Sequence, residues 1–97
     1  MTIKEYIESA PKTWRVILPR VTCKDGTRIS VQATKGFHAC AFDTDDNQLT
    51  HVEVKFASDY TPPAEWDGFC DSPIYAYVPI ELVQSLIDKH GGVSVNE

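Results

Sequence analysis

The alternation of apolar and polar positions in the middle of the chain predicts a β-sheet. From His51 to Phe56 every second residue is apolar and its neighbours are polar, which is typical of a strand with one face toward water. The same alternation runs from Ile29 to Ala33, just after an aspartate-glycine pair that favours a tight turn, so these residues predict a β-hairpin. Further strands are predicted at Trp14–Val21, Phe37–Phe42 and Ile74–Val78.

Two helices are predicted near the ends of the chain. Thr2 and Glu5 have the spacing of a capping box, in which each side chain bonds the backbone amide of the other residue, so a short helix over about Ile3–Ser9 follows. Pro79 suits the start of a second helix, because its missing N–H would have no helical partner there. Gly91 and Gly92 suit the left-handed end of that helix. Its apolar face consists of Ile80, Val83, Leu86 and Ile87.

These elements predict an α+β fold. We expect a mostly antiparallel sheet of about five strands, a short N-terminal helix, and a C-terminal helix packed on one face of the sheet. The length of 97 residues fits one domain, so residues 1–97 should form a single α+β domain. The expected core positions are Val16, Leu18, Ile29, Val31, Val52, Val54, Phe56, Val83, Leu86 and Ile87.

Two segments between the predicted elements are read as irregular. Ala57–Pro73 has no regular period and contains several prolines and a glycine, so we interpret it as a long surface loop. Loops longer than about 12 to 15 residues are often functional. Asp43–Asn47 predicts a solvated turn, because its side chains can bond their own backbone.

Composition narrows the class of protein and its compartment. No apolar run reaches the roughly 18 residues of a membrane span, and the first residues lack the order of a signal peptide, so we expect a cytosolic protein. Cys23, Cys40 and Cys70 are odd in number and widely spaced, which favours free thiols over disulfides. A net charge of −5 opposes direct binding to DNA, RNA or anionic membranes.

Charge is distributed unevenly along the chain. Between Asp43 and Asp71 eight carboxylates accompany the single cation Lys55, a local balance of −7, whereas the first 36 residues carry a balance of +4. Such asymmetry is typical of a protein that recognises a charged partner.

None of the catalytic or metal-binding patterns is complete. His38 and Cys40 share a strand face, but zinc sites usually contain a close pair of cysteines and none exists here. Positions 43, 45 and 47 match the start of a calcium loop, yet Gln48 and Val54 replace its glycine and its bidentate glutamate. Three cysteines and three histidines do not by themselves make a nucleophile and base. We expect no metal, no cofactor and no enzymatic activity.

The acidic segment combined with aromatic residues is the favoured site. Tyrosine and tryptophan anchor interfaces, and carboxylates around them attract a basic protein. An alternative for Trp66 is that it packs into the core and anchors the loop. A second alternative site is a nucleotide-binding hairpin built on Arg15, Arg20 and Arg28. The predicted partner-binding residues are Asp43, Asp45, Asp46, Asp59, Tyr60, Trp66, Asp67 and Asp71.

Five segments of the chain carry a resemblance: Val16-Ile17-Leu18-Pro19-Arg20-Val21-x-Cys23-Lys24-Asp25-Gly26, Ser30-Val31-Gln32-Ala33, His51-Val52-Glu53-Val54, Tyr77-Val78-Pro79-Ile80-Glu81-Leu82-Val83 and Lys89-His90-Gly91-Gly92. With these segments the sequence resembles a group of short proteins from phages and mobile elements of gut bacteria. The resemblance implies a setting, because accessory proteins of this size in such elements are often counter-defence factors. Such factors act as anti-CRISPR inhibitors that occupy a protein surface or as sponges that sequester nucleotide signals.

The functional expectation follows from these readings. We expect a counter-defence inhibitor, similar to anti-CRISPR proteins, that binds the basic surface of a nucleic-acid-binding defence component in the host bacterial cytosol. Direct binding to DNA, RNA or a membrane is not expected. The alternative is a nucleotide-signal sponge that uses basic and aromatic residues of the first hairpin, with a small nucleotide as its ligand.

Overall fold

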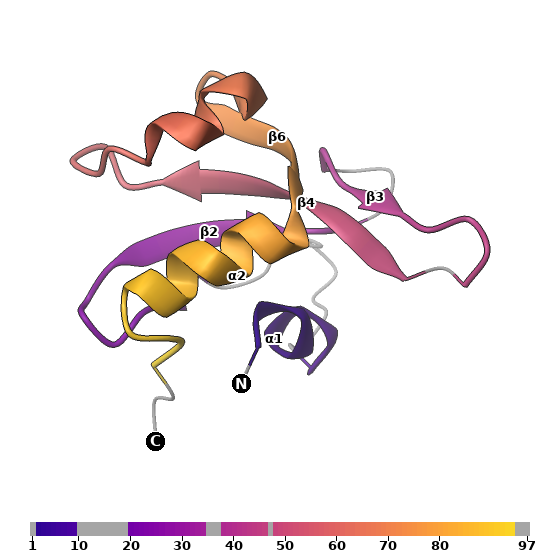
Figure 1. Cartoon of the computed structure of the whole chain (residues 1–97), viewed down its shortest axis with the longest axis horizontal. Coiled ribbons are helices and arrows are strands. Elements are labelled where there is room, and N and C mark those ends of the chain that lie inside the picture. The colour runs from indigo at the N-terminus through magenta and orange to yellow at the C-terminus, as the bar shows by residue number, and fades with distance from the viewer. Residues whose placement is uncertain (1, 10–19, 35–37, 47, 95–97) are drawn as a thin grey trace.

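The computed structural model describes residues 2–9, 20–34, 38–46 and 48–94 (Figure 1). Strands and helices over these residues confirm the predicted α+β fold. No helix in these ranges is both long enough and apolar enough to span a membrane. The elements are α1 (Ile3–Ser9), β1 (Val21–Thr22), β2 (Arg28–Gln32), β3 (Ala41–Phe42), β4 (Leu49–Phe56), the 3-10 helix η1 (Ala64–Phe69), β5 (Cys70–Asp71), β6 (Ile74–Pro79) and α2 (Ile80–Lys89).

All strand pairs of the sheet are antiparallel, and β4 is its central strand. The order is β1-β2-β4-β6-β5, and β3 also pairs with β4. Strand β2 pairs with the second half of β4, from Glu53 to Phe56, while β3 pairs with Leu49 and His51 in its first half. The described sheet therefore has six strands rather than about five. The additional strand is the short β5, which lies inside the segment that was predicted to be a loop.

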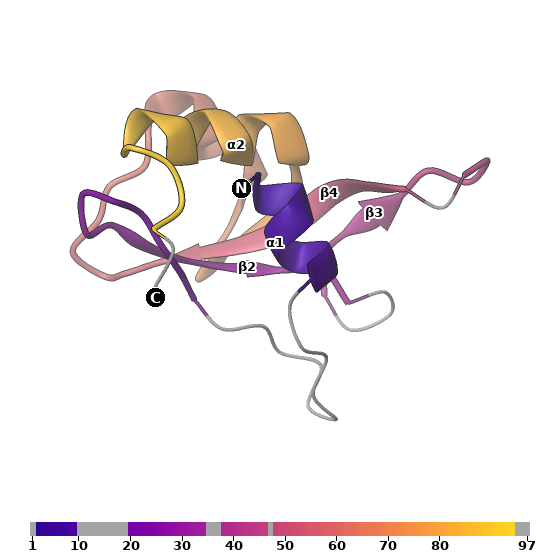
Figure 2. The same cartoon turned by 90° about the horizontal axis from the view of Figure 1, so that it is seen from below.

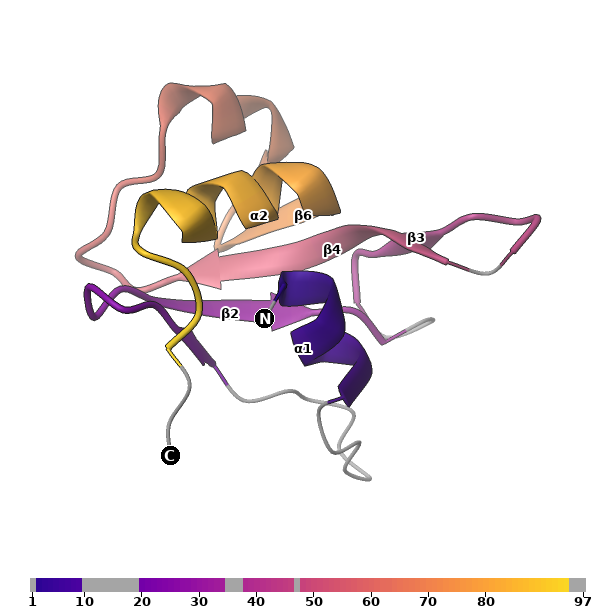
Figure 3. The same cartoon turned by 60° about the horizontal axis from the view of Figure 1, so that its bottom comes forward.

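Helix α2 covers one face of the sheet, as Figures 2 and 3 show. It begins directly after Pro79 and ends at His90, followed by Gly91 and Gly92 with φ angles of +93° and +88°. The amide of Gly92 donates to the carbonyl of Ile87 at 2.9 Å, which satisfies one of the last carbonyls of the helix. The predicted apolar face is confirmed, because Ile80, Val83, Leu86 and Ile87 are all buried.

Helix α1 has the boundaries and the cap that the sequence predicts. The amide of Thr2 donates to the Glu5 carboxylate at 2.9 Å, and the amide of Glu5 donates to the Thr2 hydroxyl at 3.1 Å. The helix packs beside α2, where the Ile3 amide donates to the side chain of Gln84 at 2.7 Å. Ile3 and Ile7 thereby join the same core as the sheet and α2.

The core largely agrees with the predicted positions but is larger. Ile29, Val31, Val52 and Val54 are buried as predicted, while Phe56 is only partly buried. Val16 and Leu18 lie outside the described residues, as does most of the strand predicted at Trp14–Val21. Buried hydrophobic residues outside the expected core positions and the α2 face are Ile3, Ile7, Val21, Cys23, Leu49, Trp66, Val78 and Val93.

Two predicted segments need correction. The interpretation of Ala57–Pro73 as a loop without regular structure is wrong, because η1 and β5 lie within it. The side chain of Trp66 draws this segment into the core, which periodicity alone does not reveal. Within the described part of Phe37–Phe42, only Ala41 and Phe42 are extended and paired, and residues 38–40 bend away from the strand.

Candidate functional site

The turn between β3 and β4 carries three exposed aspartates, Asp43, Asp45 and Asp46. One Asp43 oxygen accepts from the Asp45 amide at 2.8 Å, and one Asp46 oxygen accepts from the Gln48 amide at 3.0 Å. These bonds fix the shape of the turn and confirm the prediction that its side chains bond their own backbone. Figures 1 and 2 show that this hairpin projects from the rest of the molecule. We call the turn with its three aspartates the acidic arm.

The other predicted carboxylates lie elsewhere. Asp59 is exposed in the loop after β4, Asp67 is exposed on η1, and Asp71 is exposed on β5. The eight residues of β4 separate the acidic arm from the loop that carries Asp59, a span of about 26 Å. Figures 1 and 2 place the arm and this loop at opposite ends of β4. The structure thus divides the acidic segment into two separate groups.

Trp66 is not available to a partner. Its side chain is fully buried, with its ring centroid 5.1 Å from that of Phe56 and 5.9 Å from that of Tyr75. The edge-on geometry of these pairs is favourable for aromatic rings. Trp66 as a surface contact is therefore corrected, and the structure supports the alternative in which this residue anchors the loop to the core.

Tyr60 belongs to a hydrogen-bonded network around His90. Asp25 lies 2.6 Å from Nδ1 of His90, and the Tyr60 hydroxyl lies 2.9 Å from Nε2. Because a carboxylate can only accept, Nδ1 donates to Asp25, while Nε2 is hydrogen-bonded to the Tyr60 hydroxyl. The Thr27 amide also donates to Asp25 at 2.9 Å. We call Asp25, Thr27, Tyr60 and His90 the His90 network.

Electrostatics assign this network a role in holding the fold. The Thr27 amide and hydroxyl, followed by the imidazole of His90, lower the pKa of Asp25 to about 2. Burial and then the charge of Asp25 raise the pKa of Tyr60. The phenol therefore keeps its proton, although Asp25, His90 and Tyr60 are ordered as in a catalytic triad. The sequence did not indicate this network, because its members are up to 65 positions apart.

The basic residues of the first hairpin are only partly described. Arg20 and Arg28 are exposed on either side of the β1–β2 hairpin, whereas Arg15 lies outside the described residues. In the part of the chain that the structure describes, neither arginine is in an ion pair or lies against an aromatic ring. Over the described residues, the hairpin presents cations to solvent without an aromatic ring on which a nucleotide base could stack.

The three thiols lie in different environments. Cys23 is buried, Cys40 is partly buried and Cys70 is exposed, and all three are free. Burial raises the pKa of Cys23 and of Cys40, which keeps both thiols protonated. Among the described residues, no cluster of three or more histidine, cysteine, aspartate or glutamate side chains could hold a metal ion.

Tyr77 is a surface residue that the sequence did not single out. Its exposed fraction is 55%, and no other large hydrophobic side chain is exposed among the described residues. Tyr75 pairs with Val54 and Val78 pairs with Val52, so two residues of β6 stand opposite Glu53 in a β-bulge. Regular alternation would place Tyr75 and Tyr77 on the same face. The bulge instead leaves the ring of Tyr75 in the aromatic cluster of the core and turns Tyr77 outward.

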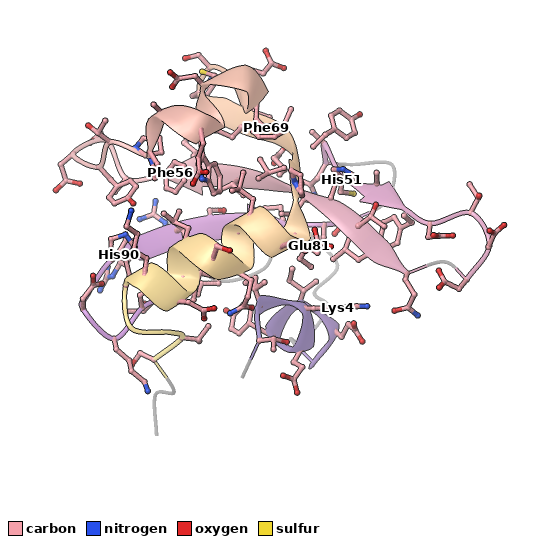
Figure 4. All side chains as sticks on the ribbon, viewed as in Figure 1. Lys4, His51, Phe56, Phe69, Glu81 and His90 are labelled. Atoms are coloured by element: carbon pink, nitrogen blue, oxygen red, sulfur yellow. The ribbon has the colours of Figure 1, made fainter. Side chains whose placement is uncertain are left out.

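Backbone bonds hold the bulge in place. The Tyr77 amide donates to the carbonyl of Ala39 at 3.1 Å, and the amide of Ala39 donates to the Glu53 carboxylate at 3.3 Å. Nearby, Nδ1 of His51 lies 2.8 Å from the Thr50 hydroxyl. Figure 4 shows His90 at the left, where α2 ends, and His51 well apart from it, near the middle of the molecule. Tyr77 and the His90 network are thus two distinct polar regions of the structure.

Three comparisons of the chain with known proteins found no match. No protein family, no curated protein and no solved structure shows significant similarity to the chain.

Proposed function

We propose that this protein is a non-enzymatic binding protein whose acidic arm docks on the basic surface of another protein. The observation that carries the proposal is the projection of three exposed aspartates on one turn. Among the described residues none of them is in an ion pair, and the intraturn bonds engage one oxygen each of Asp43 and Asp46. The remaining carboxylate oxygens can accept hydrogen bonds from lysine and arginine.

The mechanism is stoichiometric binding. Carboxylates on a projecting turn occupy the lysines and arginines that a nucleic-acid-binding protein uses to contact phosphates, so the target loses its substrate surface. Clustered charge also steers encounter with a basic target and makes association sensitive to salt. Together with the resemblance to phage and mobile-element proteins, this favours a counter-defence inhibitor, similar to anti-CRISPR proteins, that acts on a defence component in the host bacterial cytosol.

Peptide titration with NMR detection tests whether the arm is the binding surface. We expect octa-arginine to shift the amide signals of residues 43–46 more than those around Asp59, Asp67 and Asp71. The second group is an internal control because it has comparable charge. Replacing Asp43, Asp45 and Asp46 with lysine should raise the Kd at least about threefold, since each exposed ion pair contributes about 0.2 to 1 kcal/mol. Equal or larger shifts around Asp59, Asp67 and Asp71 would contradict the proposal.

A second candidate function is the sequestration of a nucleotide. It is favoured by the exposure of Arg20 and Arg28 without an ion pair among the described residues. In this case the purified protein should release a nucleotide when it is denatured, and Arg28→Glu should prevent this. Release of a nucleotide together with a silent triple-aspartate variant would place the function on the hairpin instead of the arm.

A further inference from the structure

The backbone of Tyr77 is strained. Its φ angle of +51° lies in the left-handed region, where a bulky side chain is uncommon. Of the described residues, the others with positive φ are the glycines Gly26, Gly91 and Gly92, which adopt it without a steric penalty. Strain of this kind persists only where surrounding contacts enforce it, and it is concentrated at functional sites. The position of the Tyr77 ring therefore requires a reason.

The contacts that enforce the strain are visible around Ala39. The carbonyl of Ala39 accepts from the Tyr77 amide at 3.1 Å, and the amide of Ala39 donates to the Glu53 carboxylate at 3.3 Å. The bulge in β6 and the bend at residues 38–40 are thus fixed together over the face of β4 that carries Glu53. The result is an aromatic ring aimed at solvent, because Val52 and Val54 on the opposite face of β4 are fully buried.

One partner can contact both this ring and the acidic arm. Tyr77 stands opposite Glu53 and the Asp43 amide donates to the Gln48 carbonyl, so about five residues of β4, roughly 17 Å, separate them along the strand. A standard interface covers about 800 Å² on each partner, which is wide enough to include both. Tyr60 and Tyr75 contact other aromatic rings, whereas Tyr77 has no ring contact among the described residues. Its ring is available to a partner.

We propose that Tyr77 is the aromatic contact of the acidic arm and that it selects arginine over lysine on the basic partner. This inference rests on the proposed function, because it assigns the chemistry of the same surface. A planar guanidinium stacks on a tyrosine ring and is weakly hydrated, so it can leave water for that contact. Lysine is a compact and strongly hydrated charge that gains less. Adjacent carboxylates can pair with guanidinium groups on the same target segment.

Binding of octa-arginine and octa-lysine to Tyr77 variants tests the inference. We expect wild-type protein to bind octa-arginine more tightly, and Tyr77→Ala to weaken octa-arginine by about two- to thirtyfold while octa-lysine changes little. Tyr77→Phe keeps the ring and should bind within about twofold of wild type. The change in the ratio of the two Kd values between wild type and Tyr77→Ala reports the ring. An unchanged ratio in Tyr77→Ala overturns the inference.

Two further variants separate the possible failures. Tyr77→Gly relieves the backbone strain, so it should resist denaturant better than Tyr77→Ala while it loses the arginine preference equally. Retention of the preference in Tyr77→Gly would contradict a role for the ring. The triple-aspartate variant should weaken both peptides but keep their ratio. If that variant binds both peptides as wild type does, the proposed function fails, whereas the ratio still decides the role of Tyr77.

Discussion

The two ends of the molecule use polar side chains in opposite ways. In the His90 network, Asp25, Tyr60 and His90 bond one another across the first hairpin, the loop after β4 and the end of α2. In the acidic arm, the hydrogen bonds of Asp43 and Asp46 to other described residues go to amides of their own turn. Polar groups that are satisfied by distant residues hold elements together. Polar groups that are satisfied locally keep their remaining oxygens for an external partner.

The tyrosines at the two ends show the same difference. The Tyr60 hydroxyl is hydrogen-bonded to Nε2 of His90, and the centroid of its ring lies 5.0 Å from that of Phe56. Tyr77 has its backbone fixed and its ring exposed. One residue type therefore serves the fold at one end and is presented to solvent at the other. The comparison predicts that substitutions near α2 and His90 change stability, whereas substitutions at the arm change binding.

The largest effect on stability is expected from Leu86→Ala on the buried face of α2. Leu86 is buried against the sheet, so truncation removes its transfer free energy and leaves a cavity. We expect the free energy of unfolding in urea to fall by about 2 to 5 kcal/mol. Leu82, which is only partly buried on the same helix, is the matched control and should lose less when changed to alanine. A change below about 0.5 kcal/mol in Leu86→Ala would show that α2 does not hold the core as described.

A smaller effect is expected from Tyr60→Phe, which removes only a hydroxyl. The phenylalanine ring keeps the packing, but Nε2 of His90 loses the Tyr60 hydroxyl as its hydrogen-bond partner. We expect a loss of about 0.5 to 1.5 kcal/mol in the free energy of unfolding. Tyr77→Phe removes the same atom at the other end, where no hydrogen bond is lost among described residues, and should be neutral. Equal losses in the two variants would remove the distinction between the ends.

The smallest effect is expected from Asp25→Asn and concerns how stability depends on pH in acid. The pKa of Asp25 falls from an ordinary value of 3.8 to about 2 in the folded protein. A lowered pKa means that the carboxylate stabilises the fold above about pH 4 and that this contribution is lost as the pH falls through about 2. Asp25→Asn should therefore flatten the decline of stability between these values, measured by urea unfolding at each pH.

Local signals in the sequence predicted the regular parts of the fold well. The capping box at Thr2 and Glu5, the proline and glycines around α2, and the alternation from His51 to Phe56 depend on near neighbours. The site was predicted less completely. The acidic turn was found because its aspartates are adjacent in sequence, whereas Trp66 appeared equally suited to surface and core.

The remaining features depend on contacts between distant residues. The His90 network joins position 25 to position 90, and no local pattern links them. The outward direction of Tyr77 depends on a bulge that is specified by the pairing of β6 with β4 and by the Ala39 carbonyl. A one-residue irregularity moves a side chain to the other face of a sheet, so alternation alone would place this tyrosine on the face of Tyr75.

The left-handed backbone of Tyr77 also has an evolutionary consequence. A non-glycine residue in this conformation costs about 1 to 2 kcal/mol, a penalty that glycine avoids and asparagine tolerates better. Selection for folding alone would therefore replace this tyrosine, and selection for binding would oppose the replacement. A lineage that lost its partner would drift toward glycine or asparagine at position 77 with no harm to its fold. Descendants that still meet the partner would keep an aromatic ring there.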